Sequence, residues 1–355
     1  MNTPVARFQE LTGAALPVVQ APMAGAAGVP LAVAAMRAGA LASLPCAMLT
    51  PGQLQEQVGQ VRASGEGALN LNFFCHTLPA PPDESAWRAL LAPYYAGEGV
   101  APGEAAPLRR PFDAATCAVV EALRPEVVSF HFGLPEPALL ARVRASGARI
   151  FGNATTLEEA VWLAERGCDA VIAQGAEAGG HAGWFLDGHR PVPLAELLRQ
   201  MVTALDVPVI AAGGIVDRAS AAAAFAAGAA AVQAGTAFLA TPESAISPVH
   251  RALLGTVAAA DAAFTILFSG HEARGIRNRL MRELGPINGK APPFPYASNA
   301  LAPLRAKAER EGRGDYSPLW AGAGAARVRA MDVEALVAEL AHGAGEVLEG
   351  TRGEG

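Results

Sequence analysis

Eight short apolar runs alternate along this chain with longer amphipathic runs, and this alternation leaves few folds open. Strands that are apolar over their whole length are buried on both faces, as in a parallel sheet flanked by helices. Eight such strands with helices between them favour an α/β fold, the (β/α)8 TIM barrel. The runs cover residues 16–20, 40–44, 68–73, 126–132, 149–153, 170–174, 208–212 and 230–234.

One long segment does not continue this pattern. Residues 241–299 contain no further strand of the barrel type, so we expect a small, mostly helical inserted subdomain that caps the substrate site. The barrel then consists of residues 1–240 and 300–355. Helices over 300–311 and 333–348 are expected to complete its outer ring.

The strands of a TIM barrel all end at one rim, where the loops that follow them form the active site. In this chain those ends carry asparagine, glutamine, glycine and histidine. Residues 75–111 follow the third run and are long for a βα loop, so we expect them to fold over this rim as a lid. Polar groups gathered under a lid indicate a small-molecule site.

The charge and cysteine content disfavours several classes of partner. Charged residues make up 17% of the chain, the net charge is -6, and no lysine or arginine run exceeds a pair, which gives no support to binding nucleic acid or an anionic membrane. The four cysteines form no Cys-x-x-Cys pair, as expected of thiols in a reducing cytoplasm. Without a signal peptide or a membrane span in the sequence, we expect a cytoplasmic protein, either a monomer or a homodimer.

The segment QGAEAGGH, residues 174–181, follows the sixth run and ends in His181. Its glycines allow the backbone to approach a ligand closely, and histidine titrates near neutral pH. We therefore expect His181 to act on the substrate as a general base or as a hydrogen-bond donor. The alternative is a loop histidine bonded only to backbone. His131 ends the fourth run and points either into the barrel or toward the rim. No pattern marks His76, His189, His250 or His271 for a role.

Glycines at the ends of the seventh and eighth apolar runs indicate a phosphate-binding site. The seventh run ends in AAGGI, residues 211–215, and the eighth in QAGTAF, residues 233–238. Loops after strands seven and eight form the usual phosphate site of a TIM barrel, although such glycines can also serve only tight turns. Amide side chains at the same rim could hydrogen-bond the edge of a flavin ring, so we expect FMN. These amides belong to Asn70, Asn72, Gln174 and Gln233.

Other cofactor types find no support in the sequence. It contains no GxxxxGK[ST] loop and no GxGxxG after the first strand, which disfavours nucleotide hydrolysis and Rossmann-type dinucleotide binding. The rim shows no His-x-His pair, no His-x-x-x-His pair and no clustered carboxylates, so we expect no metal.

Six motifs together resemble the nitronate monooxygenase family, formerly called 2-nitropropane dioxygenases, and class I most closely. They are VVQAPMAG, NLNFF, SFHFGLP, QGAEAGGHAGWF, PVIAAGGI and QAGTAFLATPES, in order over roughly residues 15–300. The resemblance implies an FMN-dependent barrel enzyme. Its expected reaction oxidises alkyl nitronates, such as propionate 3-nitronate, with O2 to a carbonyl compound and nitrite or nitrate.

The resemblance also implies roles for single residues. His181 matches the family's active-site histidine, which would hold the nitronate, or take the α-proton of a neutral nitroalkane. His131 and Tyr296 are expected to contact the substrate. Tyr296 is the only tyrosine of FPYASNALAPLRAKAE, where family members often carry more tyrosines and a lysine, so the substrate stays open. Flavin contacts would come from Met23, Asn72, Gln174, Gly179, Gly180, Gly213, Gly214, Gln233, Gly235 and Thr236.

Two alternatives to this function stay open at the level of sequence. Flavin-dependent enoyl-ACP reductases share a loop similar to QGAEAGGH, so an NAD(P)H-dependent reductase of a quinone or an enoyl thioester is one. A barrel that binds a phosphorylated ligand without redox chemistry is the other.

Overall fold

Eight parallel strands close into a barrel, as the alternating runs predict. The computed structural model describes residues 3–103 and 108–350, without the side chains of 345–350. The strand order is β1-β9-β8-β6-β5-β4-β3-β2, and a parallel bridge between Val19 and Leu41 closes the ring. The strands are β1 (Val18–Gln20), β2 (Ala42–Pro45), β3 (Leu69–Phe74), β4 (Val127–His131), β5 (Arg149–Ala154), β6 (Ala170–Gln174), β8 (Val209–Ala212) and β9 (Ala231–Ala234).

The interior of the barrel is filled by side chains. Val19, Phe151, Ile172 and Ile210 come from four different strands and form one buried cluster. Phe8, from helix α1 (Pro4–Thr12), belongs to the same cluster and is fully buried. The barrel is therefore a packed core, and only the rim at the carboxyl ends of its strands is available for a ligand.

Helices surround the barrel, and the last of them returns to it as expected. Helix α14 packs against α9 across small residues: a Cβ placed on Gly343 would lie 2.7 Å from the amide nitrogen of Ala222. The surrounding helices are α2 (Val29–Arg37), α3 (Pro51–Ala63), α5 (Ala114–Leu123), α6 (Pro137–Ala145), α7 (Leu157–Glu165), α8 (Leu194–Ala204), α9 (Arg218–Ala226), the short α10 (Thr236–Leu239) and α14 (Val333–Gly350).

The inserted segment is less helical than we expected. Strands β10 (Ala262–Thr265) and β11 (Ala273–Ile276) pair antiparallel, and the two-residue strand β7 (Gly180–His181) extends this sheet. The QGAEAGGH segment thus ends in a strand held by the insertion, because His181 pairs with Ala273. The short helical elements of this region are α11 (Pro248–Leu253), η1 (Val257–Ala260), α12 (Arg279–Leu284) and, further along, η2 (Ala325–Arg327).

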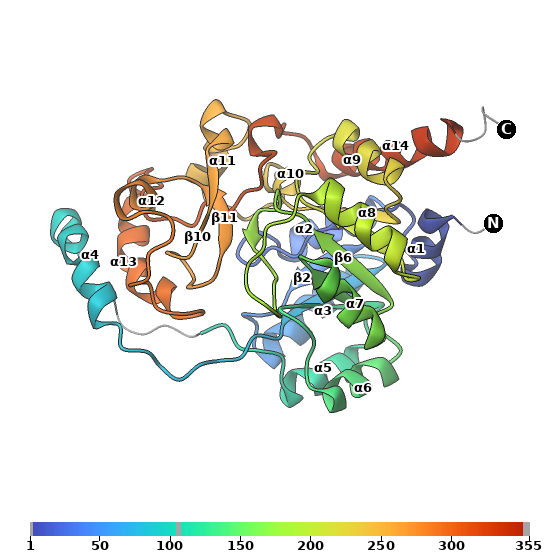
Figure 1. Ribbon diagram of the computed structural model, residues 1–355, viewed down its shortest axis with the longest axis horizontal. Coiled ribbons are helices and arrows are strands. Elements are labelled where there is room, and N and C mark those ends of the chain that lie inside the picture. The colour runs from blue at the N-terminus through green and yellow to red at the C-terminus, as the bar shows by residue number, and fades with distance from the viewer. Residues whose placement is uncertain (1–2, 104–107, 351–355) are drawn as a thin grey trace.

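Helix α13 (Ala297–Arg310) does not join the outer ring, which corrects our expectation for residues 300–311. It packs against α4 (Ser85–Glu98), on the side of the molecule away from α14 (Figure 1). Trp87 is fully buried there, and its indole nitrogen donates to the carbonyl of Ala297 at 3.4 Å. The pairing has a simple cause: both helices carry apolar faces that the barrel leaves uncovered, and each buries the other.

This packing changes the expected division of the chain. The apolar cluster of α4 and α13 also includes Leu267 and Leu280 from the insertion. We therefore propose a cap built from residues 85–103 and 241–320, rather than from 241–299 with a separate lid. Four residues of the expected lid, 104–107, lie outside the described part of the chain.

Candidate active site

A cavity of about 540 Å³ lies where the barrel rim meets the cap. This volume falls within the range of small-molecule and cofactor sites. Leu319 and Trp320 line it from the cap. All ten positions expected to contact flavin line it too, together with both histidines expected at the substrate: Met23, Asn72, Gln174, Gly179, Gly180, Gly213, Gly214, Gln233, Gly235, Thr236, His131 and His181.

Two residues singled out from the sequence do not reach this cavity. Tyr296 is buried, and its hydroxyl donates to the carbonyl of Pro79 at 2.8 Å. Asn70 is buried on β3, where its amide donates to the hydroxyl of Ser43 on β2 at 3.0 Å. Neither is among the residues that line the cavity.

Gln174 fixes the backbone around His181. Its Nε2 donates to the carbonyl of His181 at 2.8 Å, and its Oε1 accepts from the amide of Gly183 at 2.8 Å. The same oxygen accepts from Nδ2 of Asn153 at 2.9 Å. An amide oxygen has two lone pairs and an amide nitrogen two hydrogens, so only one donor of Gln174 is left for a ligand. The side chain therefore serves chiefly to position the histidine.

Gly183 allows His131 and Asn153 to approach the segment after His181. A Cβ at this position would lie 2.3 Å from Nδ2 of Asn153 and 2.6 Å from Cε1 of His131, so a side chain here would force both groups to move. This close approach brings the end of β4 against β7. Of the two orientations open to His131, the structure shows the one facing the cavity.

The His181 side chain sits in a largely aromatic pocket. The nearest ring is that of Phe294, with centroids 5.4 Å apart, followed by Trp320 at 5.7 Å. His271 lies 6.3 Å away. The sequence did not point to these three residues, because they belong to the cap and no pattern there ties them to the barrel. Phe74 and Phe132 from the barrel strands and their loops complete the pocket, each 6.1 Å from His181.

Burial keeps the histidines of this pocket neutral. It lowers the pKa of His181 well below its usual value, and the positive charge of Arg109 adds to the effect. Burial likewise lowers the pKa of His131 to about 3. The Nε2 atom of His181 is buried and has no hydrogen-bond partner among the described residues. A neutral imidazole with an unused nitrogen can donate to or accept from a bound substrate.

The glycine loops after β8 and β9 lie beside the segment that carries His181. Gly213 and Gly214 have φ values of +123° and +70°, and a Cβ on Gly213 would lie 3.0 Å from the amide nitrogen of Ala178. Gln233, at the end of β9, has a buried side-chain oxygen without a partner among the described residues. An orphaned acceptor facing a cavity is what a ligand N–H group would satisfy.

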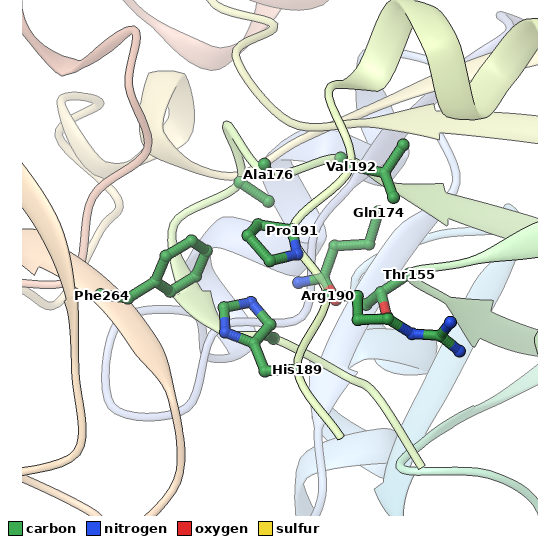
Figure 2. A pocket seen from close by; sticks show the side chains of 11 residues that line it. Thr155, Gln174, Ala176, His189, Arg190, Pro191, Val192 and Phe264 are labelled. Carbon is green, nitrogen blue, oxygen red and sulfur yellow. The ribbon is translucent and has the colours of Figure 1, made fainter. Parts of the chain in front are cut away.

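The outer side of the QGAEAGGH segment is packed rather than hollow. Figure 2 shows His189, Phe264 and Gln174 around a second pocket, whose volume of about 10 Å³ holds no more than a water molecule. The rings of His189 and Phe264 lie 4.4 Å apart, and Arg274 stacks on Phe264 while its Nε donates to the carbonyl of Ala176 at 2.9 Å. These contacts hold the QGAEAGGH segment against the cap and leave no space for a ligand larger than water.

Two further features of the described residues bear on the site. Histidine, cysteine, aspartate and glutamate side chains in the described part of the chain nowhere gather in threes at metal-binding distance. Among the described helices, none combines the length and the apolar character that crossing a bilayer requires.

Comparison with known proteins places the chain in a family. The sequence model of the nitronate monooxygenase family matches residues 6–343. A nitronate monooxygenase from Paraburkholderia phytofirmans is 38% identical over 340 residues, which are 93% of this chain and 92% of that protein. Another from Pseudomonas aeruginosa is 36% identical over 346 residues, 94% of this chain and 97% of that protein. Nitroalkane oxidase from Streptomyces ansochromogenes has a similar structure, with a TM-score of 0.88 and 36% identity over 97% of this chain and 99% of that one. The chain therefore belongs to the nitronate monooxygenase family and is an oxidoreductase.

Proposed function

We propose that this protein binds FMN in the 540 Å³ cavity and oxidises alkyl nitronates with O2 to a carbonyl compound and nitrite or nitrate. One observation carries the proposal. All ten expected flavin positions and His181 line a single cavity, although they come from segments spread over more than two hundred residues of sequence. The fold brings these residues from separate motifs to one cavity of a size that suits a cofactor.

The residues of the cavity suit FMN in both size and chemistry. Backbone N–H groups around Gly214 and Gly235 would hold the phosphate, since loops after these strands bind phosphate in many barrels. The orphaned oxygen of Gln233 and the amide oxygen of Asn72, whose Nδ2 donates to Ser129, would meet the polar edge of the ring. When bound, FMN supplies the electron acceptor for the reaction.

His181 is suited to a substrate that is already an anion. Its lowered pKa makes it a weak base, so it is poorly fitted to remove a proton from carbon. A nitronate carries its negative charge before it binds. The neutral imidazole of His181 then needs only to donate a hydrogen bond to a nitronate oxygen, while Phe294 and Trp320 keep water away from it.

The proposal is tested by asking which electron donor the protein accepts. Purified protein loaded with FMN is mixed without O2 with ethyl nitronate or with NADH, and flavin absorbance is followed. We expect the flavin absorbance to change rapidly with the nitronate and to stay constant with NADH. Rapid bleaching by NADH with no response to nitronate would instead identify an NAD(P)H-dependent reductase. Protein that stays colourless after incubation with FMN would favour a phosphoryl-ligand barrel without redox chemistry.

A further inference from the structure

Arg109 is a cation in the cavity wall without a carboxylate partner among the described residues. It lines the cavity, and its Nε is buried and makes no hydrogen bond. Arg305, the other arginine of the lining, differs in this respect, because its Nε donates to Glu309 at 2.9 Å. The same carboxylate oxygen accepts from the Ser317 hydroxyl at 2.7 Å. Arg305 is therefore neutralised locally and Arg109 is not.

The described groups that face Arg109 do not offset its charge. They are Arg305, which repels it, and the histidines His76 and His181, whose pKa values burial lowers and the charge of Arg109 lowers further. Guanidinium groups remain protonated at any physiological pH. A partly buried cation without a counter-ion is costly, so an anionic ligand would relieve this arrangement.

We do not expect the phosphate of FMN to supply that anion. The backbone next to Arg109 is tied to the end of β3, where the amide of Phe112 donates to the carbonyl of Phe74 at 2.8 Å. The phosphate loops follow β8 and β9. Strands β4, β5 and β6 separate β3 from β8 in one direction around the ring, and β2 and β1 separate it from β9 in the other. Arg109 therefore approaches the cavity from a part of the rim at least two strands away from either phosphate loop, and its charge acts on His181.

We propose that Arg109 binds the two oxygens of the substrate's O–N–O group and selects the nitronate anion over the neutral nitroalkane. The inference rests on the proposed function, since it names the residue that recognises the substrate's charge. A guanidinium presents parallel N–H donors in one plane, and a nitronate presents two oxygens in one plane, so the pair can form two hydrogen bonds as arginine does with carboxylates. His181 would donate to the same group from β7.

Substrate kinetics of Arg109→Gln and Arg109→Lys test this role. We expect Arg109→Gln to lower kcat/KM for ethyl nitronate by roughly 10- to 100-fold, the value of a hydrogen bond to a charged group. The inhibition constant of neutral nitroethane should change by less than about threefold, because no charge is involved. Arg109→Lys should lie between wild type and Arg109→Gln. Arg110→Gln, which removes an exposed neighbouring charge, is the matched control and should behave as wild type.

A binding measurement separates this inference from the proposed function. Nitrate has a planar O–N–O unit and undergoes no turnover, so its dissociation constant is measured on the FMN-loaded protein from the change in flavin absorbance. Arg109→Gln should raise the dissociation constant of nitrate by a factor similar to its loss of kcat/KM for ethyl nitronate. If wild type binds nitrate through Arg109 but oxidises no nitronate, the proposed function fails and the anion site stands. Two results would overturn the role of Arg109. One is that Arg109→Gln weakens nitroethane inhibition as much as it lowers kcat/KM for nitronate. The other is that Arg109→Gln and Arg109→Lys both bind nitrate as wild type does.

Discussion

The side-chain amide of Gln174 holds the main chain that follows the His181 Cα, donating to the His181 carbonyl at 2.8 Å and accepting from the amide of Gly183 at 2.8 Å. One residue at the end of β6 thus sets the position of β7. The opposite edge of β7 is held by β11, where His181 pairs with Ala273. The imidazole is oriented by the barrel and by the cap together.

Loss of the Gln174 amide should mimic loss of the histidine itself. We expect Gln174→Ala to lower kcat for nitronate by roughly 10- to 100-fold, because His181 is no longer held in place. In the double variant with His181→Ala, the loss should be little greater than for His181→Ala alone, since both changes remove one function. Independent, multiplicative losses would show that Gln174 acts on the reaction by another route, such as contact with the flavin.

His181→Ala should separate turnover from cofactor binding. The expected phosphate and ring contacts lie on other residues, so the variant should keep its FMN and lose nitronate oxidation by a factor of about 100 or more. The comparison is His342→Ala, which removes an exposed histidine on α14. Bound flavin and steady-state rates are measured for both. Full activity in His181→Ala would mean that another histidine of the pocket, such as His271, carries the role.

Gly214→Val should produce protein without flavin. Gly214 has a φ of +70°, and its Cβ would lie 3.2 Å from Cβ of Glu177, so a side chain here displaces the loop proposed to hold the phosphate. Gly147→Val is the matched control: its φ is +95°, nothing lies within 4 Å of its Cβ, and it follows α6, away from the cavity. Both changes cost about 1–2 kcal/mol of stability from backbone strain. Only Gly214→Val should lower the FMN content; equal flavin loss in both would show that the strain, and not the loop, is responsible.

The buried histidines should make the protein less stable in acid. Burial lowers the folded-state pKa of His76 and His250 to about 4 and that of His131 to about 3, below the unfolded value of about 6.5. Between these values the unfolded chain binds more protons than the folded one, so the free energy of unfolding falls as pH drops from about 6.5 toward 4 and is unaffected by these groups above neutrality.

Substituting one such histidine tests this linkage. His250 is 7% exposed, and His250→Gln should reduce the pH dependence of stability in that window by up to about 1.4 kcal/mol per pH unit. Urea unfolding at several pH values gives the slope, and His342→Gln, exposed on α14, should retain the wild-type slope. An unchanged slope in His250→Gln would show that folding does not lower the pKa of this histidine.

The sequence predicted the barrel well and the cap poorly, for a physical reason. Each barrel strand is apolar on its own and needs no distant partner to be recognised, as β6 illustrates with four buried residues before Gln174. Helix α13 looked equally suited to the outer ring, because its apolar face does not reveal that α4, some two hundred residues away, will cover it.

The same distinction applies to the site. Gly213, Gly214 and His181 were found because glycine pairs after strands have a local meaning. Arg109 and His271 were not found, because a charged or titratable residue in a long segment is expected to be exposed to solvent. Only the fold shows that Arg109 lines the cavity and that His271 lies beside His181. The family resemblance suggested that Tyr296 contacts the substrate, but its hydroxyl donates to the carbonyl of Pro79.

Oxygen consumption by the FMN-loaded protein is the most direct test of the central claim, that the cavity around His181 oxidises nitronate anions. Ethyl nitronate and propionate 3-nitronate are compared with nitroethane and with NADH in an oxygen electrode, with nitrite and nitrate measured in the products. We expect rapid O2 uptake with a nitronate, formation of nitrite or nitrate, much slower reaction with nitroethane and none with NADH. No uptake with either nitronate, or uptake driven by NADH alone, would contradict it.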